Sequence, residues 1–275
     1  MMMATAPVVV RGGGELGTAA ARLLFLSGFP VVVLERAQPL AVRRLVAFSE
    51  AVNTGESVVE GVTARHLPVA KLGPAADFVA VSVDPDGAVL ARLRPYVLVD
   101  ARMQKDNRET TRGDAALVIG LGPGFVAGDD VHAVIETQRG PDLGRVLWAG
   151  SAEPDSMRPS AVLGYTEKRV VRAPVPGRFL SQARIGDVVI PGQVLGLVDA
   201  QPVRAAIAGL VRGLIADGVE VPAGIKIGDI DPRGPGIDPA HVSDKARAIA
   251  AGVLEAVLIS RRRGQGETMG QTVLR

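Results

Sequence analysis

The chain has 275 residues, of which 47% are hydrophobic and 22% charged, with 31 Lys and Arg against 29 Asp and Glu. These are globular values, so they exclude a disordered or fibrous chain and allow one large domain or two smaller ones. The near-balanced, interspersed charges and the 3% aromatic content disfavour nucleic acid as a partner.

The chain contains no cysteine, which excludes disulfides, thiolate metal sites and iron–sulfur clusters. Its three histidines, His66, His132 and His241, have no metal-binding spacing, so we expect no metal site. The first residues lack the features of a signal peptide, and no apolar run approaches the length of a membrane-spanning helix. We therefore expect a cytoplasmic protein that does not enter a membrane.

The first predicted strand, Val8 to Val10, leads through Arg11 into a glycine turn, which is followed by a predicted helix from Thr18 to Leu26. The turn carries Gly12, Gly13, Gly14 and Gly17, with the first, third and fourth in GxGxxG register. A second strand, Phe29 to Leu34, ends in Glu35, at the spacing beyond Gly17 that a ribose-binding acid has in this motif. This order is typical of dinucleotide binding, in which backbone amides face a phosphate and the acid faces a ribose.

Packing alone is the alternative explanation of the same turn. Arg11 precedes the turn, and Arg36 follows Glu35, so cations lie at both ends of the expected crevice. The ligand is therefore left open between NAD(P), another nucleotide and a bulkier anion.

Three further buried strands are predicted, at Phe78 to Val83, Tyr96 to Val99 and Ala115 to Ile119. Asp100 and Arg102 follow the second of these, and Asn107 lies in the polar loop after them. Because ligands bind at the carboxyl ends of parallel strands, these side chains are candidate binding residues.

A second glycine-rich loop, with Gly120, Gly122 and Gly124, follows the last of these strands. Such a loop can form an amide nest for an anion, or it can serve only as a tight connection. We hypothesise that both glycine loops, Asp100 and Arg102 face one pocket.

Val131 to Thr137 alternates polar and apolar residues, as a half-exposed strand does, and pairs by prediction with Arg145 to Trp148 in a hairpin. His132 on this strand is expected to be structural rather than a general base. Ser151 to Ser160, rich in Pro and Ser, is interpreted as a linker.

After the linker the sequence repeats itself with a period of about 32 residues, a length typical of repeated structural units. Gly186, Val189, Gly192, Gly196 and Asp199 align with Gly218, Val221, Gly224, Gly228 and Asp231. Two such halves bury a shared core by interlocking. The pattern resembles the biotinyl/lipoyl barrel-sandwich family, but residues 199–204 contain no lysine to carry biotin or lipoate, so neither cofactor is expected.

An apolar-faced helix beginning near Ser243 is predicted at the C-terminal end. The predicted divisions are a Rossmann-like phosphate-binding domain (1–165), a barrel-sandwich hybrid domain (166–234), a helix that packs on the first domain (235–260) and a flexible tail (261–275). The fold class is thus α/β with a mainly parallel sheet, followed by a smaller all-β domain.

Eight stretches between Val8 and Leu258 carry a resemblance to a known family, namely VVVRGGGELGT, VLERAQPLAVRR, FSEAV, VLVDARM, LVIGLGPGF, DVHAVIET, GRVLWAGSAEP and VSDKA. Through these stretches the span resembles the accessory family named for the selenium-dependent molybdenum hydroxylase system. The resemblance implies a role in cofactor maturation with a molybdenum hydroxylase as partner, and it brings no established reaction.

Two functions follow as expectations. The first is an accessory protein that binds a nucleotide or a molybdopterin-type phosphate ligand, with no turnover and with a homo-oligomer left open. The alternative is an NAD(P)-dependent oxidoreductase or other nucleotide-using enzyme that employs Asp100, Arg102, Asn107 and His132. No general base lies beside a nucleophile in the sequence, so catalytic residues are unknown and binding is favoured.

Overall fold

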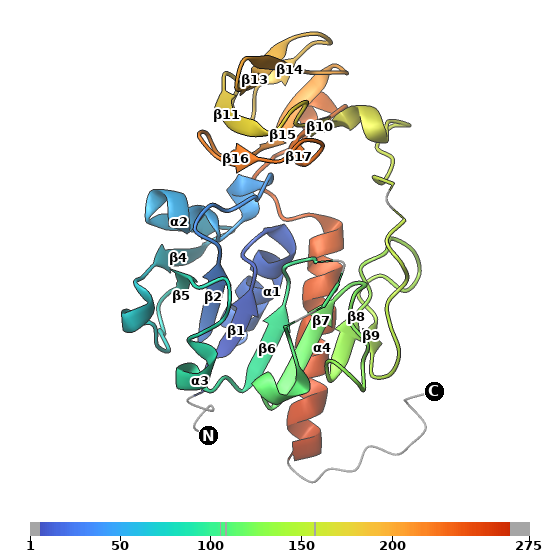
Figure 1. The fold of residues 1–275 in the computed structure, drawn as a ribbon. Coiled ribbons are helices and arrows are strands. Elements are labelled where there is room, and N and C mark those ends of the chain that lie inside the picture. Colours follow the sequence, from blue (N-terminus) through green and yellow to red (C-terminus); the bar gives the residue numbers. More distant parts are fainter. Residues whose placement is uncertain (1–5, 105, 108, 157, 265–275) are drawn as a thin grey trace.

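The computed structural model describes residues 6–104, 106–107, 109–156 and 158–264. Figure 1 shows a large sheet with helices beside it, two small sheets above it, and a long C-terminal helix that returns to the large sheet. No helix in the described ranges is both long and apolar enough to cross a membrane.

The large sheet has nine strands in the order β3-β4-β5-β2-β1-β6-β7-β8-β9. Pairing is parallel from β4 to β8 and antiparallel at the two edges, β3 with β4 and β8 with β9. The strands are β1 (Val8–Arg11), β2 (Val31–Glu35), β3 (Glu56–Val59), β4 (Val62–His66), β5 (Val79–Val83), β6 (Val97–Asp100), β7 (Leu117–Leu121), β8 (Ala133–Ile135) and β9 (Val146–Leu147).

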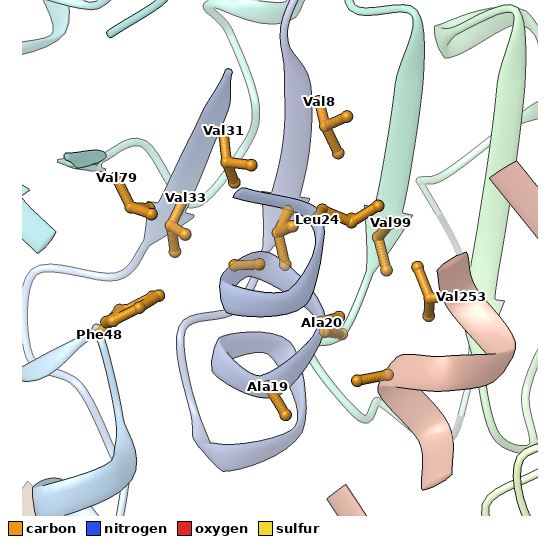
Figure 2. Close-up of a cluster of buried hydrophobic side chains, with 14 of the residues drawn as sticks. Val8, Ala19, Ala20, Leu24, Val31, Val33, Phe48, Val79, Val99 and Val253 are labelled. Carbon is orange, nitrogen blue, oxygen red and sulfur yellow. The ribbon is translucent and has the colours of Figure 1, made fainter. Parts of the chain in front are cut away.

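The central strands are valine-rich and buried along their whole length, as both faces of the sheet are covered. On one face, Val8, Val31 and Val33 pack with Ala20 and Leu24 of α1 (Glu15–Leu26). Figure 2 shows these side chains meeting, with Val253 of the C-terminal helix beside them. The two longest helices therefore share one face of the sheet.

The opposite face, with Val9, Val32 and Leu98, is covered by loop segments and the four-residue helix α3 (Leu90–Leu93). Another short helix, α2 (Glu50–Thr54), precedes β3. A doubly wound sheet needs crossover helices on both faces. The predicted Rossmann-like domain followed by a biotinyl/lipoyl-like barrel-sandwich is therefore corrected to a mixed α/β chain with a large, partly parallel sheet and few helices.

Residues 170–231 form two four-stranded sheets, ordered β10-β17-β15-β12 and β14-β13-β11-β16. Their strands are β10 (Val170–Arg172), β11 (Gly177–Ser181), β12 (Val188–Val189), β13 (Val194–Val198), β14 (Gln201–Arg204), β15 (Gly209–Leu214), β16 (Glu220–Val221) and β17 (Lys226–Asp231). A shift by one period of the sequence repeat carries β10 to β13 onto β14 to β17. When each strand is replaced by its counterpart in the other half, the order β10-β17-β15-β12 becomes β14-β13-β11-β16. Each sheet therefore contains strands of both halves.

The C-terminal helix α4 (Asp244–Gly264) packs against α1 and the β7–β9 edge of the large sheet. The contact is close, because a Cβ on Gly252 would overlap the carbonyl oxygen of Gly144. Residues 261–264 are helical, so the predicted tail starts later than expected, and its remainder, 265–275, lies outside the described residues.

The hairpin of β3 and β4 is missing from the sequence-based prediction, as are the short helices α2 and α3. These elements have four or five residues each, and β3 is mostly exposed, so their hydrophobic periodicity is too short to be recognised. The predicted strand at Val131 to Thr137 is shorter, since β8 covers only Ala133–Ile135.

Candidate ligand site at the carboxyl edge of the sheet

A cavity of about 800 Å³ lies where the parallel strands end. Its walls come from the segments that follow β1, β2, β5 and β6, namely Gly12 and Gly14 to Leu16, Leu34 to Gln38, Leu40 and Ala41, Pro85 and Asp86, and Ala101 to Gln104 with Glu109. This volume lies within the range of small-molecule sites, and the position is where open α/β sheets bind ligands. We define this space as the edge cavity.

Three glycines of the first turn are required by the protein itself. Gly12 has φ +96°, and a Cβ there would lie 2.9 Å from the carbonyl oxygen of Ala101. A Cβ on Gly13 would lie 2.8 Å from the amide nitrogen of Ser49, and one on Gly17 would overlap the carbonyl oxygen of Gly12. Packing therefore explains these glycines, and only Gly12 among the three lines the edge cavity.

Gly14 differs from its neighbours. It precedes α1 with φ −68° and ψ −178°, angles that any residue adopts, and a Cβ placed on it meets nothing within 4 Å. Its missing side chain leaves open space in the edge cavity, beside the first turn of α1. No internal contact of the protein requires glycine at this position.

Glu35, at the end of β2, lines the same cavity and is held by backbone amides. Its Oε2 accepts a hydrogen bond from the Gly13 amide at 2.8 Å, and its Oε1 accepts one from the Arg36 amide at 2.8 Å. A carboxylate oxygen accepts more than one hydrogen bond, so each retains capacity for a ligand hydroxyl. The predicted acid thus lies beside the predicted turn.

Asp100 is buried at the end of β6 and is used internally. It accepts bonds from Arg102 Nη2 at 2.7 Å, Arg102 Nε at 3.1 Å and the Thr110 hydroxyl at 2.6 Å. Burial alone would raise the pKa of Asp100, but the hydrogen bonds from Arg102 and Thr110 outweigh it and hold that pKa below its ordinary value. Asp100 therefore stays ionised and does not line the edge cavity.

Arg102 lines the cavity, and each of its three guanidinium nitrogens already donates a hydrogen bond within the protein. Besides Asp100, it bonds to Glu109 Oε2 at 2.7 Å and Thr110 Oγ1 at 3.2 Å. Burial lowers the pKa of Arg102, and the hydrogen bonds from its guanidinium to Asp100 and Glu109 reverse this and raise it. A ligand would meet the edge of a guanidinium that the protein already holds in place.

Arg11 is not a cavity residue. It is 2% exposed, and it donates to the Thr110 hydroxyl at 3.1 Å, the Pro85 carbonyl at 2.8 Å and Glu109 at 3.2 Å. These bonds tie β1 to the loops after β5 and β6. The predicted ligand-binding role of Arg11 is therefore replaced by a structural one.

Asn107 likewise shapes its own loop. Its Nδ2 donates to the Thr110 carbonyl at 2.7 Å, and its Oδ1 accepts from the amides of Thr110 and Glu109 at 3.0 and 3.3 Å. Asn107 is not part of the cavity wall. Its effect on a ligand would be through Glu109, which the loop presents to the cavity.

The second glycine loop does not reach the edge cavity. A Cβ on Gly120 would overlap the ring of Phe125, and one on Gly122, at φ +75°, would lie 2.6 Å from Thr137 Oγ1. Gly124, at φ +102°, accepts the Asn107 amide on its carbonyl. The loop borders, through Pro123, a separate cavity of about 220 Å³ that shares only Met103 and Gln104 with the first. The hypothesis of one pocket for both loops is therefore wrong.

His132 also lies outside the edge cavity wall. Its Nδ1 accepts the Val118 amide at 3.0 Å, which requires an unprotonated nitrogen, and burial lowers its pKa. In the described part of the chain, no group of three or more His, Asp or Glu side chains is arranged to hold a metal ion.

Sequence reasoning missed several wall residues, among them Leu16, Pro85, Met103 and Gln104. The strand-end rule that predicted Glu35 also applies to Pro85, which follows β5. No local pattern distinguishes Met103, whose position depends on the loop that follows β6.

No protein-family model matches the chain. An uncharacterized protein of Escherichia coli (strain K12), YqeB, is 44% identical over 261 residues, which are 94% of this chain and 48% of that protein. The chain therefore spans about half the length of the curated relative it matches. The similarity shows no function.

Among solved structures, an aspartoacylase family protein from Mesorhizobium loti matches with 11% identity over 82% of this chain and 85% of its own, at a TM-score of 0.26. A succinylglutamate desuccinylase/aspartoacylase from Rhodobacter sphaeroides matches with 15% identity over 82% and 85%, at a TM-score of 0.24. Such weak likeness assigns this chain neither an activity nor a substrate.

Both of these solved structures are aspartoacylase-like. The correction of the Rossmann and biotinyl/lipoyl-like description rests on the strand order and the few helices of this chain, because a likeness at these TM-scores carries no argument. Neither comparison tests whether the protein takes part in cofactor maturation.

Proposed function

We propose that the edge cavity binds a nucleotide or a related phosphate-bearing ligand, with a phosphate against Gly14 and the first turn of α1. Gly14 carries this proposal, because it is the glycine of the turn that neither packing nor backbone conformation requires. The open space at its Cα position lies beside a helix N-terminus, where the helix dipole and free amides favour an anion.

Glu35 supports a nucleotide over a bare phosphate. Its two oxygens are oriented by the Gly13 and Arg36 amides, and both remain able to accept hydroxyl groups. A ribose supplies two adjacent hydroxyl donors, which suit this carboxylate. The exposed Arg36 next to it lines the same cavity and would favour an additional phosphate on the ribose.

Binding without turnover is the role that the cavity supports best. Asp100 and Arg102 are paired with each other, and His132 accepts a backbone amide away from the cavity. We propose a cytoplasmic accessory protein that holds its ligand for a partner enzyme. Molybdopterin remains among the candidate ligands, because its phosphate would use the same open space at Gly14.

Titration calorimetry and native mass spectrometry of the full chain with NAD, NADP, ATP, CTP and molybdopterin test this proposal. Gly14→Val fills the open space with a branched side chain and is expected to weaken binding of the preferred ligand at least tenfold. Gly73→Val is the matched control, since a Cβ there also meets nothing within 4 Å and Gly73 lies outside the cavity. The proposal fails if the wild-type protein binds none of these ligands, or if Gly14→Val binds them as Gly73→Val does.

A further inference from the structure

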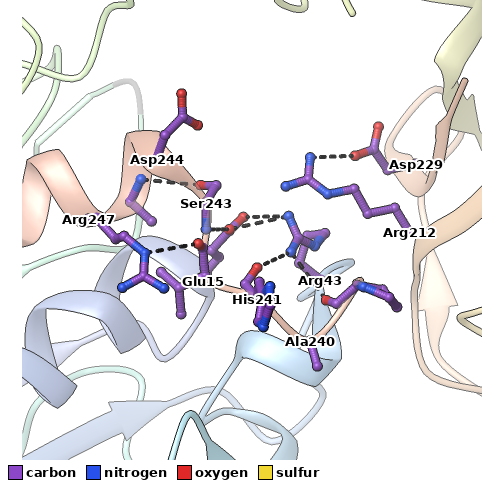
Figure 3. A network of polar contacts seen from close by, with 12 residues as sticks. Glu15, Arg43, Arg212, Asp229, Ala240, His241, Ser243, Asp244 and Arg247 are labelled. Atoms are coloured by element: carbon purple, nitrogen blue, oxygen red, sulfur yellow. Dashed lines mark hydrogen bonds and ion pairs between the residues drawn. The ribbon is translucent and has the colours of Figure 1, made fainter. Parts of the chain in front are cut away.

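A second hollow of about 860 Å³ lies between the large sheet and the β10-β17-β15-β12 sheet. Its walls come from the first turns of α1 and α4, from Arg43, from residues 155, 156 and 158–162 and from the strands β10, β15 and β17. We call it the interdomain cleft. Figure 3 shows its centre, where Arg212 extends from β15 toward Arg43.

Positive charge dominates this cleft. Among the described residues in its wall, nine cationic side chains face four carboxylates. The cations are Arg43, Arg139, Arg158, Arg169, Arg172, Arg212, Lys226, Arg233 and Lys245, and the carboxylates are Glu15, Asp155, Asp229 and Asp244. The wall residues therefore have a formal excess of five positive charges, which the neighbouring Asp231, bonded to Arg233 at 2.6 Å, and Glu167, 4.0 Å from Arg172, reduce to three.

Three of the carboxylates are shared among these cations. Glu15 pairs with Arg43 at 3.3 Å, and Asp244 pairs with Arg139 at 2.7 Å. Asp229 pairs with Arg169 and also lies 3.6 Å from Lys226. The cleft thus retains cationic charge beyond what its own acids neutralise.

Arg212 shows this excess most clearly. Its ion pairs with Asp229 and Asp231 are both 3.9 Å long, which is too long for a hydrogen bond. It stands where the ladder of β15 with β17 shifts register, between Val211 and Gly213. Bulges of this kind redirect a side chain, here into the cleft.

The internal repeat shows that the fold itself does not need these charges. One period earlier in the repeat, Arg212, Lys226 and Asp229 correspond to Leu180, Val194 and Leu197. The ladder of β11 with β13 is regular at Leu180, without the register shift. Two equivalent strand positions therefore differ in charge and geometry, and the charged copy is the one that faces the cleft.

Burial makes the excess charge costly. Arg43 is 8% exposed, and its Nε is buried without a hydrogen-bond partner. Burial lowers the pKa of Arg43, Glu15 opposes this, and the positive charge of Arg212 adds to the lowering. Burial also lowers the pKa of Lys226 and of Lys245. An anion in the cleft would relieve both the repulsion and the desolvation.

We propose that the interdomain cleft is a second ligand site, specific for a compact polyanion that carries a chain of phosphates. The volume suits a small molecule rather than a polymer, and several guanidinium groups suit bidentate contacts to phosphate oxygens. This site is separate from the edge cavity. The two share Glu15 and Leu16, whereas Gly14 belongs only to the edge cavity and Arg212 only to the cleft.

Calorimetric titration of the full chain with inorganic triphosphate, in salt on the order of physiological ionic strength, tests the site. Saturable 1:1 binding is expected. Arg212→Gln and Arg172→Gln should each weaken it about tenfold, the loss expected for one charge-assisted contact. A comparison of ATP with adenosine shows whether a nucleoside adds affinity to that of the phosphate chain. Gly14→Val should leave triphosphate binding unchanged, even if the edge cavity of this variant no longer binds its ligand.

The repeat supplies a matched control. Arg172 in the cleft donates to the Gly224 carbonyl at 3.0 Å, and Arg204, its counterpart in the second half of the repeat, donates to the Gly192 carbonyl at 2.8 Å. Arg204 is outside the cleft wall, so Arg204→Gln should bind triphosphate as the wild type does. Absence of saturable binding by wild-type protein overturns the proposal, as does an equal loss in Arg172→Gln and Arg204→Gln.

Discussion

Asp100 holds Arg102, which follows it closely along the chain, by two parallel bonds, from Nη2 to Oδ2 at 2.7 Å and from Nε to Oδ1 at 3.1 Å. The pair lies where β6 ends, with Asp100 buried and the edge of Arg102 in the cavity wall. An acid that looked like a ligand-binding residue thus serves to position a cation.

Asp100→Asn should destabilise the protein at pH 7 by about 2–4 kcal/mol, because it leaves a part-buried guanidinium without its main partner. The folded-state pKa of Asp100 is depressed below 3.8. Its stabilising effect is therefore present above the unfolded-state pKa and is lost as the pH falls through the folded-state pKa. Urea unfolding from pH 7 downward should show the difference from wild type narrowing below about pH 3.8. The exposed Asp77→Asn is the control, and a difference independent of pH would contradict this assignment.

Gly17→Ala should destabilise the protein and Gly14→Ala should not, although the two glycines lie in the same turn. A Cβ on Gly17 overlaps the Gly12 carbonyl, so the change should cost about 1–3 kcal/mol despite the higher helix propensity of alanine. A Cβ on Gly14 meets nothing, so that change should stay within about 0.5 kcal/mol of wild type. Equilibrium unfolding in urea compares the two, and equal destabilisation would mean that packing also explains Gly14.

As the pH is raised, the affinity for triphosphate should begin to fall at a lower pH than it would if Lys226 had the pKa of an exposed lysine. Burial lowers the pKa of Lys226 below its ordinary value, so this side chain loses its positive charge at a lower pH than an exposed lysine does. A phosphate chain binds the protonated form better, and therefore the dissociation constant should rise as the pH passes that depressed pKa. Titrations from pH 7 to pH 10 measure the effect. Lys226→Arg, which stays charged, should flatten the profile, and an unchanged profile in this variant would exclude Lys226 from the site.

Much of the chain's local structure could be predicted from sequence. The valine-rich segments form strands near their predicted positions, and Gly12, Gly14 and Glu35 lie at the cavity that strand-end reasoning anticipated. The spacing of the repeat is visible again in the strand bounds of residues 170–231. These features depend on residues close in sequence or on a regular period, which the sequence displays directly.

The tertiary structure decided the roles of individual polar residues. Arg11 and Thr110 are 99 residues apart in sequence, and Arg43 meets the His241 carbonyl across 198 residues, so no local pattern reveals either contact. In the second glycine loop, Phe125 fills the space beside Gly120 and Thr137 the space beside Gly122. The interdomain cleft likewise exists only where separate segments converge. Hydrophobic periodicity determines which face of an element is buried, whereas the partner of a buried charge is determined by how those elements pack together.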